Sequence, residues 1–142
     1  MFIVVIGIIA GVLELAFLVY CAVHENVKDI VIGIARRRGL QPRHVADSIR
    51  LDHPQTPFFI EVRESSSGIV VRLGCEDIKD YIREVVDMED DPRGVIEELL
   101  DDMVSVAYEI AERLRRNGFK AILDTRSASM DVLSELEDAL EE

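Results

Sequence analysis

The chain has 142 residues, with 28 Asp or Glu against 16 Lys or Arg, and a net charge of −12 at pH 7. A chain this acidic repels the phosphates of nucleic acid, so we expect no nucleic-acid partner. The two cysteines are too few for a disulfide framework. Arg far outnumbers Lys, and Asn and Gln are few, which is a composition found in thermophiles.

Residues 2–23 form an apolar run of twenty-two residues with a single charge, Glu14, and no proline. As a helix rising about 1.5 Å per residue, the run would reach about 33 Å, enough to cross the hydrocarbon core of a bilayer. Fourteen of its residues are Leu, Ile, Val or Phe. Their insertion gain of about 4 to 8 kcal/mol exceeds the cost of about 3 kcal/mol for one charged side chain. The sequence therefore predicts a transmembrane helix over residues 1–23.

Two other interpretations of this apolar run stay open. A cleaved signal peptide is disfavoured, because no Lys or Arg precedes the run and no clear cleavage site follows it. In a fully soluble α/β protein, residues 2–6 would be a buried parallel strand and residues 11–23 a buried helix of the same core. Such a protein would be extracted without detergent.

One face of the predicted anchor helix combines small residues with a carboxyl group. At 100° per residue, five residues fall within an arc of about 80°. Two glycines spaced four apart let a second helix approach closely, and a Glu that faces lipid is costly. We therefore expect a helix–helix interface, through self-association or with other membrane-protein subunits. Its residues are Gly7, Gly11, Glu14, Leu18 and Cys21.

Residues 24–56 are predicted to be a basic, helical juxtamembrane collar and linker. Within them, residues 24–50 carry a net charge of +3, whereas residues 51–142 carry −14. The excess of Lys and Arg shortly after the predicted anchor places the C-terminal part in the cytoplasm. Basic side chains there suit an anionic leaflet. The residues expected at the membrane surface are Arg36, Arg37 and Arg38.

Two short helices are predicted in the collar. The first has apolar residues at i, i+3, i+4 and i+7 from Val27 and ends at Gly39, which is a natural C-cap. The second begins at Pro42, because proline suits the first turn of a helix. The apolar side of this second helix would comprise Val45, Ala46 and Ile49.

Residues 57–142 are predicted to form one acidic α+β domain. Two runs with alternating apolar residues flank a Ser-rich turn, which indicates an antiparallel hairpin. Asp91 followed by Pro92 is a strong helix start. The element order β-β-α-α-β-α predicts a three-stranded sheet with helices packed on one face. The expected strands cover 58–64, 69–73 and 119–124, and the expected helices cover 76–88, a long stretch from 92 to the stop at 117–118, and the C-terminal region.

The sequence carries no specific catalytic or metal-binding motif, so we expect no catalytic residue, metal or cofactor. Cys75 is interpreted as a small buried cysteine. The loop at residues 124–127 follows the last strand, where α/β folds often carry sites. Four further residues are close in sequence but lack a recognised ligand spacing, and we interpret them as solvated surface. They are His44, Asp47, Asp52 and His53.

These features together predict a single-pass protein of the cell membrane whose C-terminal domain is cytoplasmic. The expected function is that of an accessory or scaffold subunit, acting through protein–protein contacts of its anchor helix and acidic domain rather than as an enzyme. The alternatives are a membrane-tethered small enzyme or ligand-binding domain, and the fully soluble protein. A deep pocket with converging polar groups would favour the enzyme or ligand-binding domain.

Overall fold

The structure is a computed structural model, and it describes residues 26–142. The predicted transmembrane helix over residues 1–23, with the interface residues expected on it, lies outside the described residues. From residue 26 onward, none of the helices combines the length and the apolar character needed to cross a membrane.

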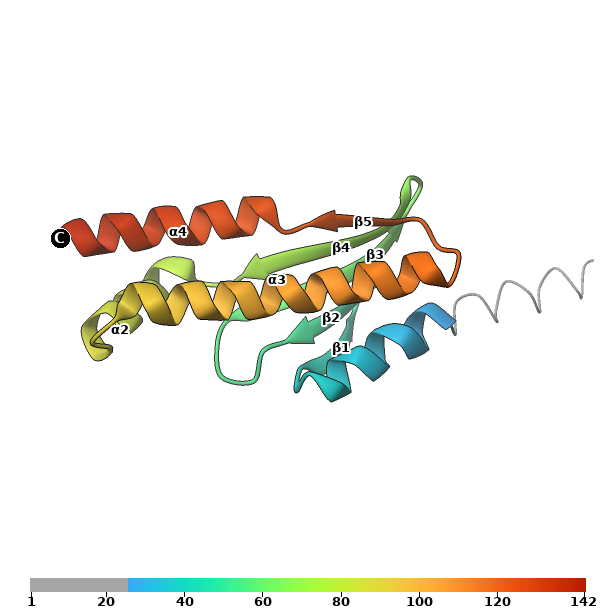
Figure 1. The fold of residues 1–142 in the computed structure, drawn as a ribbon, viewed down its shortest axis with the longest axis horizontal. Coiled ribbons are helices and arrows are strands. Elements are labelled where there is room, and N and C mark those ends of the chain that lie inside the picture. The colour runs from blue at the N-terminus through green and yellow to red at the C-terminus, as the bar shows by residue number, and fades with distance from the viewer. Residues whose placement is uncertain (1–25) are drawn as a thin grey trace, which may run out of the picture.

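The described residues form an α+β fold (Figure 1). A helix over residues 26–37, called helix 26–37 below, comes first. The elements that follow are β1 (Gln41–Val45), β2 (Ser48–Asp52), β3 (Phe58–Ser65), β4 (Gly68–Cys75), α2 (Ile78–Met88), α3 (Pro92–Arg116), β5 (Ala121–Asp124) and α4 (Arg126–Glu141).

The sheet has five strands in the order β1-β2-β3-β4-β5, not the three that the sequence predicts. Neighbouring strands are antiparallel except β4 and β5, which are parallel and are connected through α2 and α3. The three predicted strands correspond to β3, β4 and β5. The expected linker between collar and domain instead joins two neighbouring strands, β2 and β3.

The predicted second helix of the collar is wrong, because β1 and β2 form a hairpin there. Ala46 lies in its two-residue turn with φ of 53°, and the Ser48 hydroxyl donates a hydrogen bond of 2.9 Å to the Val45 carbonyl. Every residue of β1 is exposed, so this edge strand shows no apolar alternation. The apolar residues that suggest a helix lie on the two sides of a turn.

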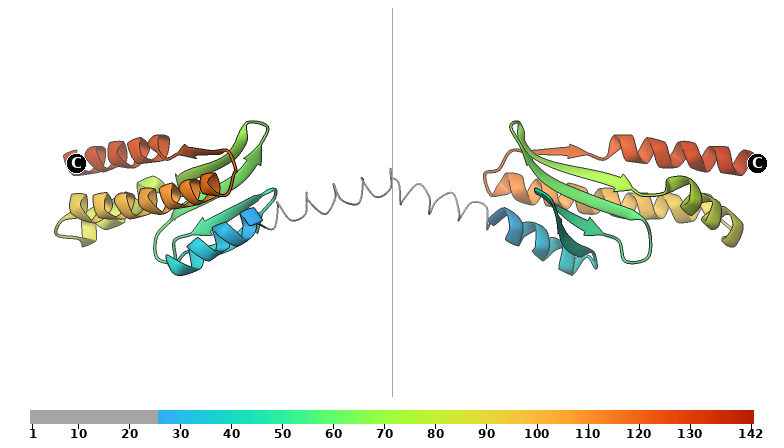
Figure 2. Two further views of the ribbon diagram at one scale, coloured as in Figure 1. Left: turned by 45° about the vertical axis from the view of Figure 1, so that its right-hand side comes forward. Right: turned by 180° about the vertical axis from the view of Figure 1, so that it is seen from behind.

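The sheet is covered by helices on one face only. In Figure 1, α3 and helix 26–37 lie in front of the strands, and the view from behind in Figure 2 shows no described helix across the opposite face. The helices α2 and α4 pack together beyond one end of the sheet. Alternating residues of β2, β3 and β4 point into the core. They are Leu51, Phe58, Ile60, Val62, Ile69, Val71 and Leu73.

The helices complete this core with the apolar side chains that lie along one face of each helix. Helix 26–37 contributes Val27, Val31, Ile34 and Ala35 to the same cluster as the strands. The predicted collar therefore supplies a helix and two strands to the fold. The buried stripe of α3, which follows the predicted helical period, is Ile96, Leu100, Met103, Val106, Ala107, Ile110, Ala111 and Leu114.

The predicted end of helix 26–37 and the predicted limits of α3 are confirmed. Gly39 has φ of 75°, and the Leu40 N–H donates to the Ala35 carbonyl at 2.9 Å, as in a Schellman C-cap. At the start of α3, the Asp91 carboxylate accepts a 3.1 Å hydrogen bond from the Gly94 N–H. The Asp91 cap therefore fixes the residue at which α3 begins.

We predict that Ile34→Ala lowers the free energy of unfolding by about 2–5 kcal/mol, because it removes a side chain that is only 3% exposed. Lys28→Ala is the matched control on the exposed side of the same helix, and we expect it to change stability by about 0.5 kcal/mol or less. Urea unfolding of the purified chain measures both. Equal effects would mean that helix 26–37 does not pack in the core.

Candidate binding surface

The face of the sheet that no described helix covers, called the open sheet face below, carries charged side chains in a regular row. The strand register places one residue of each strand in line across the sheet. Because side chains alternate along a strand, these residues point away from the apolar core. The row consists of Arg43, Arg50, Glu61, Arg72 and Asp124.

Arg50 is the most buried cation of this row, with a side chain only 14% exposed. Its Nε lies 2.7 Å from Oδ1 of Asp52, and its Nη1 lies 2.6 Å from Oε1 of Glu76. Burial alone would lower the pKa of Arg50, but the hydrogen bonds to Glu76 and Asp52 raise it on balance. The same bond to Arg50 lowers the pKa of Glu76. Arg50 is therefore a fixed structural cation.

Phe59 lies flat beneath Arg50. The guanidinium carbon of Arg50 is 3.7 Å from the ring centroid, and that of Arg72 is 5.5 Å away. Phe59 is opposite Gly74 in the register, and a Cβ at Gly74 would overlap Cζ of the ring. The missing side chain of Gly74 thus makes room for the ring, and Phe59 is 7% exposed despite its place on the open sheet face.

The rest of the row is more exposed. Arg72 Nη2 lies 3.6 Å from Oε1 of Glu61, with side chains 43% and 23% exposed. Arg43 Nε lies 2.6 Å from Oδ2 of Asp52. Asp124 forms no ion pair with any described residue. The open sheet face therefore has arginine and carboxylate groups with capacity for further contacts.

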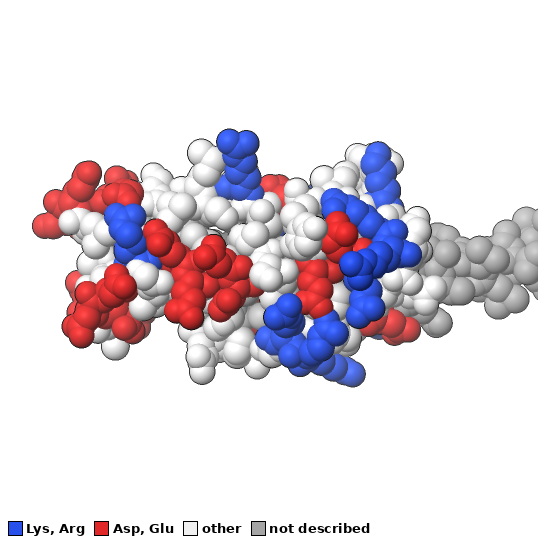
Figure 3. Space-filling model, viewed as in Figure 1, with Lys and Arg blue, Asp and Glu red and all other residues white. Residues whose placement is uncertain are grey.

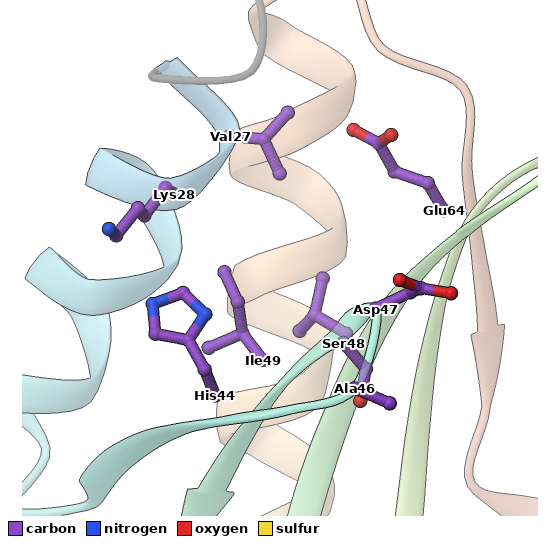
Figure 4. A pocket seen from close by; sticks show the side chains of 9 residues that line it. Val27, Lys28, His44, Ala46, Asp47, Ser48, Ile49 and Glu64 are labelled. Atoms are coloured by element: carbon purple, nitrogen blue, oxygen red, sulfur yellow. The ribbon is translucent and has the colours of Figure 1, made fainter.

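A groove of about 510 Å³ lies on the other side of the sheet, between helix 26–37 and the β1–β2 hairpin. Figure 4 shows Lys28 and His44 toward one side of it and Asp47 and Glu64 toward the other, with Ile49 between them. The groove is open rather than deep, and its charged groups are spread along its rim.

The four residues considered as metal ligands do not converge. His44 and Asp47 line the groove, whereas Asp52 binds arginines on the open sheet face. His53 Nδ1 accepts a 3.2 Å hydrogen bond from the backbone N–H of Gln55, and burial lowers its pKa, opposed by the charge of Asp102. Residues 26–142 contain no group of three potential ligands placed to hold a metal ion.

Cys75 and the loop after β5 share a small cavity of about 160 Å³, which also contains Ser127 and Asp131 of α4. Burial raises the pKa of the Cys75 thiol to about 12, with further contributions from Asp77 and Glu76. The thiolate is the nucleophilic form of cysteine, so this environment does not suit a catalytic thiol at neutral pH. Cys75 is half-buried rather than fully buried.

Two of the three arginines expected at the membrane surface form ion pairs within the domain. Arg37 and Arg38 both form ion pairs with Glu109 of α3, and Arg38 Nη2 lies 2.7 Å from its Oε2. Arg36 is exposed and has no ion pair with a described residue. Its expected place at the membrane surface stays a prediction.

Charges are segregated along the molecule (Figure 3). Lys and Arg predominate over helix 26–37 and the C-terminal part of α3, in the right-hand half of the view. Asp and Glu predominate over α2 and the N-terminal part of α3. Arg113 and Arg116 at the end of α3 line one shallow pocket with Arg37 and Arg38, although the two pairs are distant in sequence.

No protein-family model matches the chain, and neither the curated proteins nor the solved structures gave a significant match.

We predict that Gly74→Ala lowers the free energy of unfolding by about 1–3 kcal/mol, because the new methyl group would overlap the Phe59 ring. Gly33→Ala is the matched control, since a Cβ there meets no atom within 4 Å. In a helix this control should raise stability by about 0.5–1 kcal/mol. Thermal unfolding monitored by circular dichroism measures both, and a neutral Gly74→Ala would contradict the stacked arrangement.

Proposed function

We propose that the protein is a single-pass, membrane-anchored accessory or scaffold subunit that acts through protein–protein contacts. In this proposal residues 1–23 cross the cell membrane and the described domain lies on the cytoplasmic side. The anchor face built on Gly7, Gly11 and Glu14 contacts other membrane-protein subunits or a second copy.

The observation that carries the proposal is the basic half of the domain. Residue 26 lies at the end of the domain where helix 26–37 and the C-terminus of α3 meet, and Lys and Arg predominate over this half (Figure 3). Arg36, Arg113 and Arg116 are exposed there and form no ion pair with a described residue. Each basic group near an anionic leaflet contributes about 1 kcal/mol, within a Debye length of about 8–10 Å. A domain held close to a membrane at residue 26 would therefore present its basic half to the anionic lipid.

The described residues support binding rather than catalysis. Arg50, whose side chain is only 14% exposed, is held in structural ion pairs by Asp52 and Glu76. The environment of Cys75 disfavours its thiolate. An active site would require a nucleophile or acid–base pair with a converging partner, and the charged groups of the groove in Figure 4 are spread along its rim.

The groove of Figure 4 supports a second candidate, a membrane-tethered ligand-binding domain. Its volume of about 510 Å³ falls in the range of small-molecule sites. Val27, Ile49 and Val62 line it together with charged side chains of both signs. Binding of a small amphipathic ligand that Ile49→Trp abolishes would favour this candidate over a scaffold.

To test the proposal, membranes from cells expressing the full chain are treated with alkaline carbonate and then with mild detergent. We expect the chain to resist carbonate, to dissolve in detergent, and to be protected from protease added outside intact cells. Release without detergent would contradict the anchor and favour the fully soluble alternative.

The subunit role is tested on complexes purified in mild detergent. Because an exposed carboxyl group in lipid is costly, Glu14 should face a partner helix, and Glu14→Leu should reduce complex size. Val19→Leu, about 140° away on the same helix, is the matched control and should leave the complex intact. Recovery of the unaltered chain as a lone monomer would argue against the subunit role.

A further inference from the structure

We propose that the open sheet face binds the same face of a second copy of this chain. The two sheets would face each other and be related by a two-fold axis. This axis runs parallel to the strands, midway between the two sheets, and lies over the gap between β3 and β4. This inference goes beyond the proposed function, which assigns self-association to the anchor helix alone.

Charge order along the row carries the proposal. From β2 to β5 the row reads Arg50, Glu61, Arg72 and Asp124, so positive and negative groups alternate. A two-fold axis between β3 and β4 reverses this order in the second copy. Arg50 then faces Asp124 of the second copy, and Glu61 faces Arg72 of the second copy. All four positions meet opposite charges, which is the complementarity expected of an isologous interface.

The charges also select this axis over its neighbour. An axis along β3 would place Glu61 against Glu61 and Arg50 against Arg72 of the second copy, and like charges held face to face are strongly unfavourable. An axis between β3 and β4 avoids every such pair. In the next row of the register, Arg63 would face Val70 of the second copy, and Ser48 would face Ile122 of the second copy.

Several side chains at the centre have capacity for a second partner. Glu61 and Arg72 lie 3.6 Å apart within one sheet, and each carboxylate can accept from two arginines. Around the axis, two glutamates and two arginines would alternate. Phe59 would face Gly74 of the second copy, so the flat ring meets the position with the least bulk. Asp124 would gain in Arg50 of the second copy an ion pair that it lacks among the described residues.

The expected contact is small. Four strands about 4.8 Å apart and about six residues long cover roughly 19 by 20 Å, or about 400 Å² per copy. Contacts of this size are weak in solution. A shared bilayer would raise the local concentration of copies, and this last step alone rests on the proposed function.

The test uses full-length chains carrying donor and acceptor fluorophores, mixed in detergent micelles. When two copies that both carry Glu61→Arg associate, the Arg introduced at 61 faces the native Arg72 of the other copy. When both copies carry Arg72→Glu, the Glu introduced at 72 faces the native Glu61, so each variant places like charges beside the axis. We expect energy transfer between identical variants to indicate association weakened about tenfold or more. In the mixed pair, the Arg introduced at 61 of one copy faces the Glu introduced at 72 of the other. The native Arg72 and Glu61 form the second contact, so both contacts join opposite charges and association should recover. Contacts of the anchor helix contribute equally to every combination.

Arg83→Glu on α2 is the matched control for Arg72→Glu, because it makes the same charge change on a side chain that is 65% exposed and away from the sheet. It should leave association unchanged. Equal energy transfer for all combinations, or a mixed pair as weak as the identical ones, would overturn the proposal.

A second measurement covers the case in which a charge variant fails to fold. In a chain with Cys21→Ser and Cys75→Ser, one copy carries Ser48→Cys and the other carries Ile122→Cys. Facing sheets lie about 10 Å apart, so the proposed axis brings these two positions within reach of a short bismaleimide, whereas each position lies about 17 Å from its own counterpart. Ser48 is 7% exposed, so both thiols are first shown to react with a monofunctional maleimide. Cross-linking of the mixed pair alone is then expected, and its absence would reject the proposed axis.

Discussion

The structure depends on a sheet that is buried on one face only. Along β3 and β4, apolar side chains alternate with polar ones, and the antiparallel register aligns Ile60 with Leu73 and Val62 with Val71. This alignment gives one continuous apolar face, which α3 and helix 26–37 cover. A shift of one residue in either strand would exchange the faces and bury Glu61 or Arg72. The same constraint that builds the core therefore also builds the charged row on the opposite face.

The two charged regions of the domain differ in what their charges contact. On the open sheet face, arginines are matched by carboxylates, and Arg50 is fixed by Asp52, Glu76 and the Phe59 ring. Matched charges of this kind give orientation and specificity more than affinity. Over helix 26–37 and the end of α3, exposed arginines are in excess (Figure 3). An excess of one sign suits a broad surface of opposite charge, such as an anionic leaflet. The proposed contacts with lipid and with a second copy therefore use different parts of the domain.

The sequence predicts those elements whose burial pattern is strong. The hairpin of β3 and β4, the helices α2, α3 and α4, and the strand β5 all follow an apolar period that the structure confirms. The hairpin of β1 and β2 was missed because β1 is exposed throughout and β2 has only two inward side chains, Ile49 and Leu51. The charged row could not be predicted for a related reason. Its members range from β1 to β5, and only the strand register brings Arg50, Glu61 and Asp124 into line. The predicted anchor lies outside the described residues.

The one-sided sheet is tested most directly by thiol labelling of two neighbouring positions on β3. In a chain with Cys21→Ser and Cys75→Ser, Val62→Cys and Arg63→Cys are compared under native conditions, in solutions dilute enough to keep copies apart. Val62 is 4% exposed and points toward the helices, whereas Arg63 is exposed on the open sheet face. We expect the thiol at 63 to react with a maleimide at nearly the rate of a free thiol, and the thiol at 62 to react only after unfolding. Equal rates at the two positions would contradict the account.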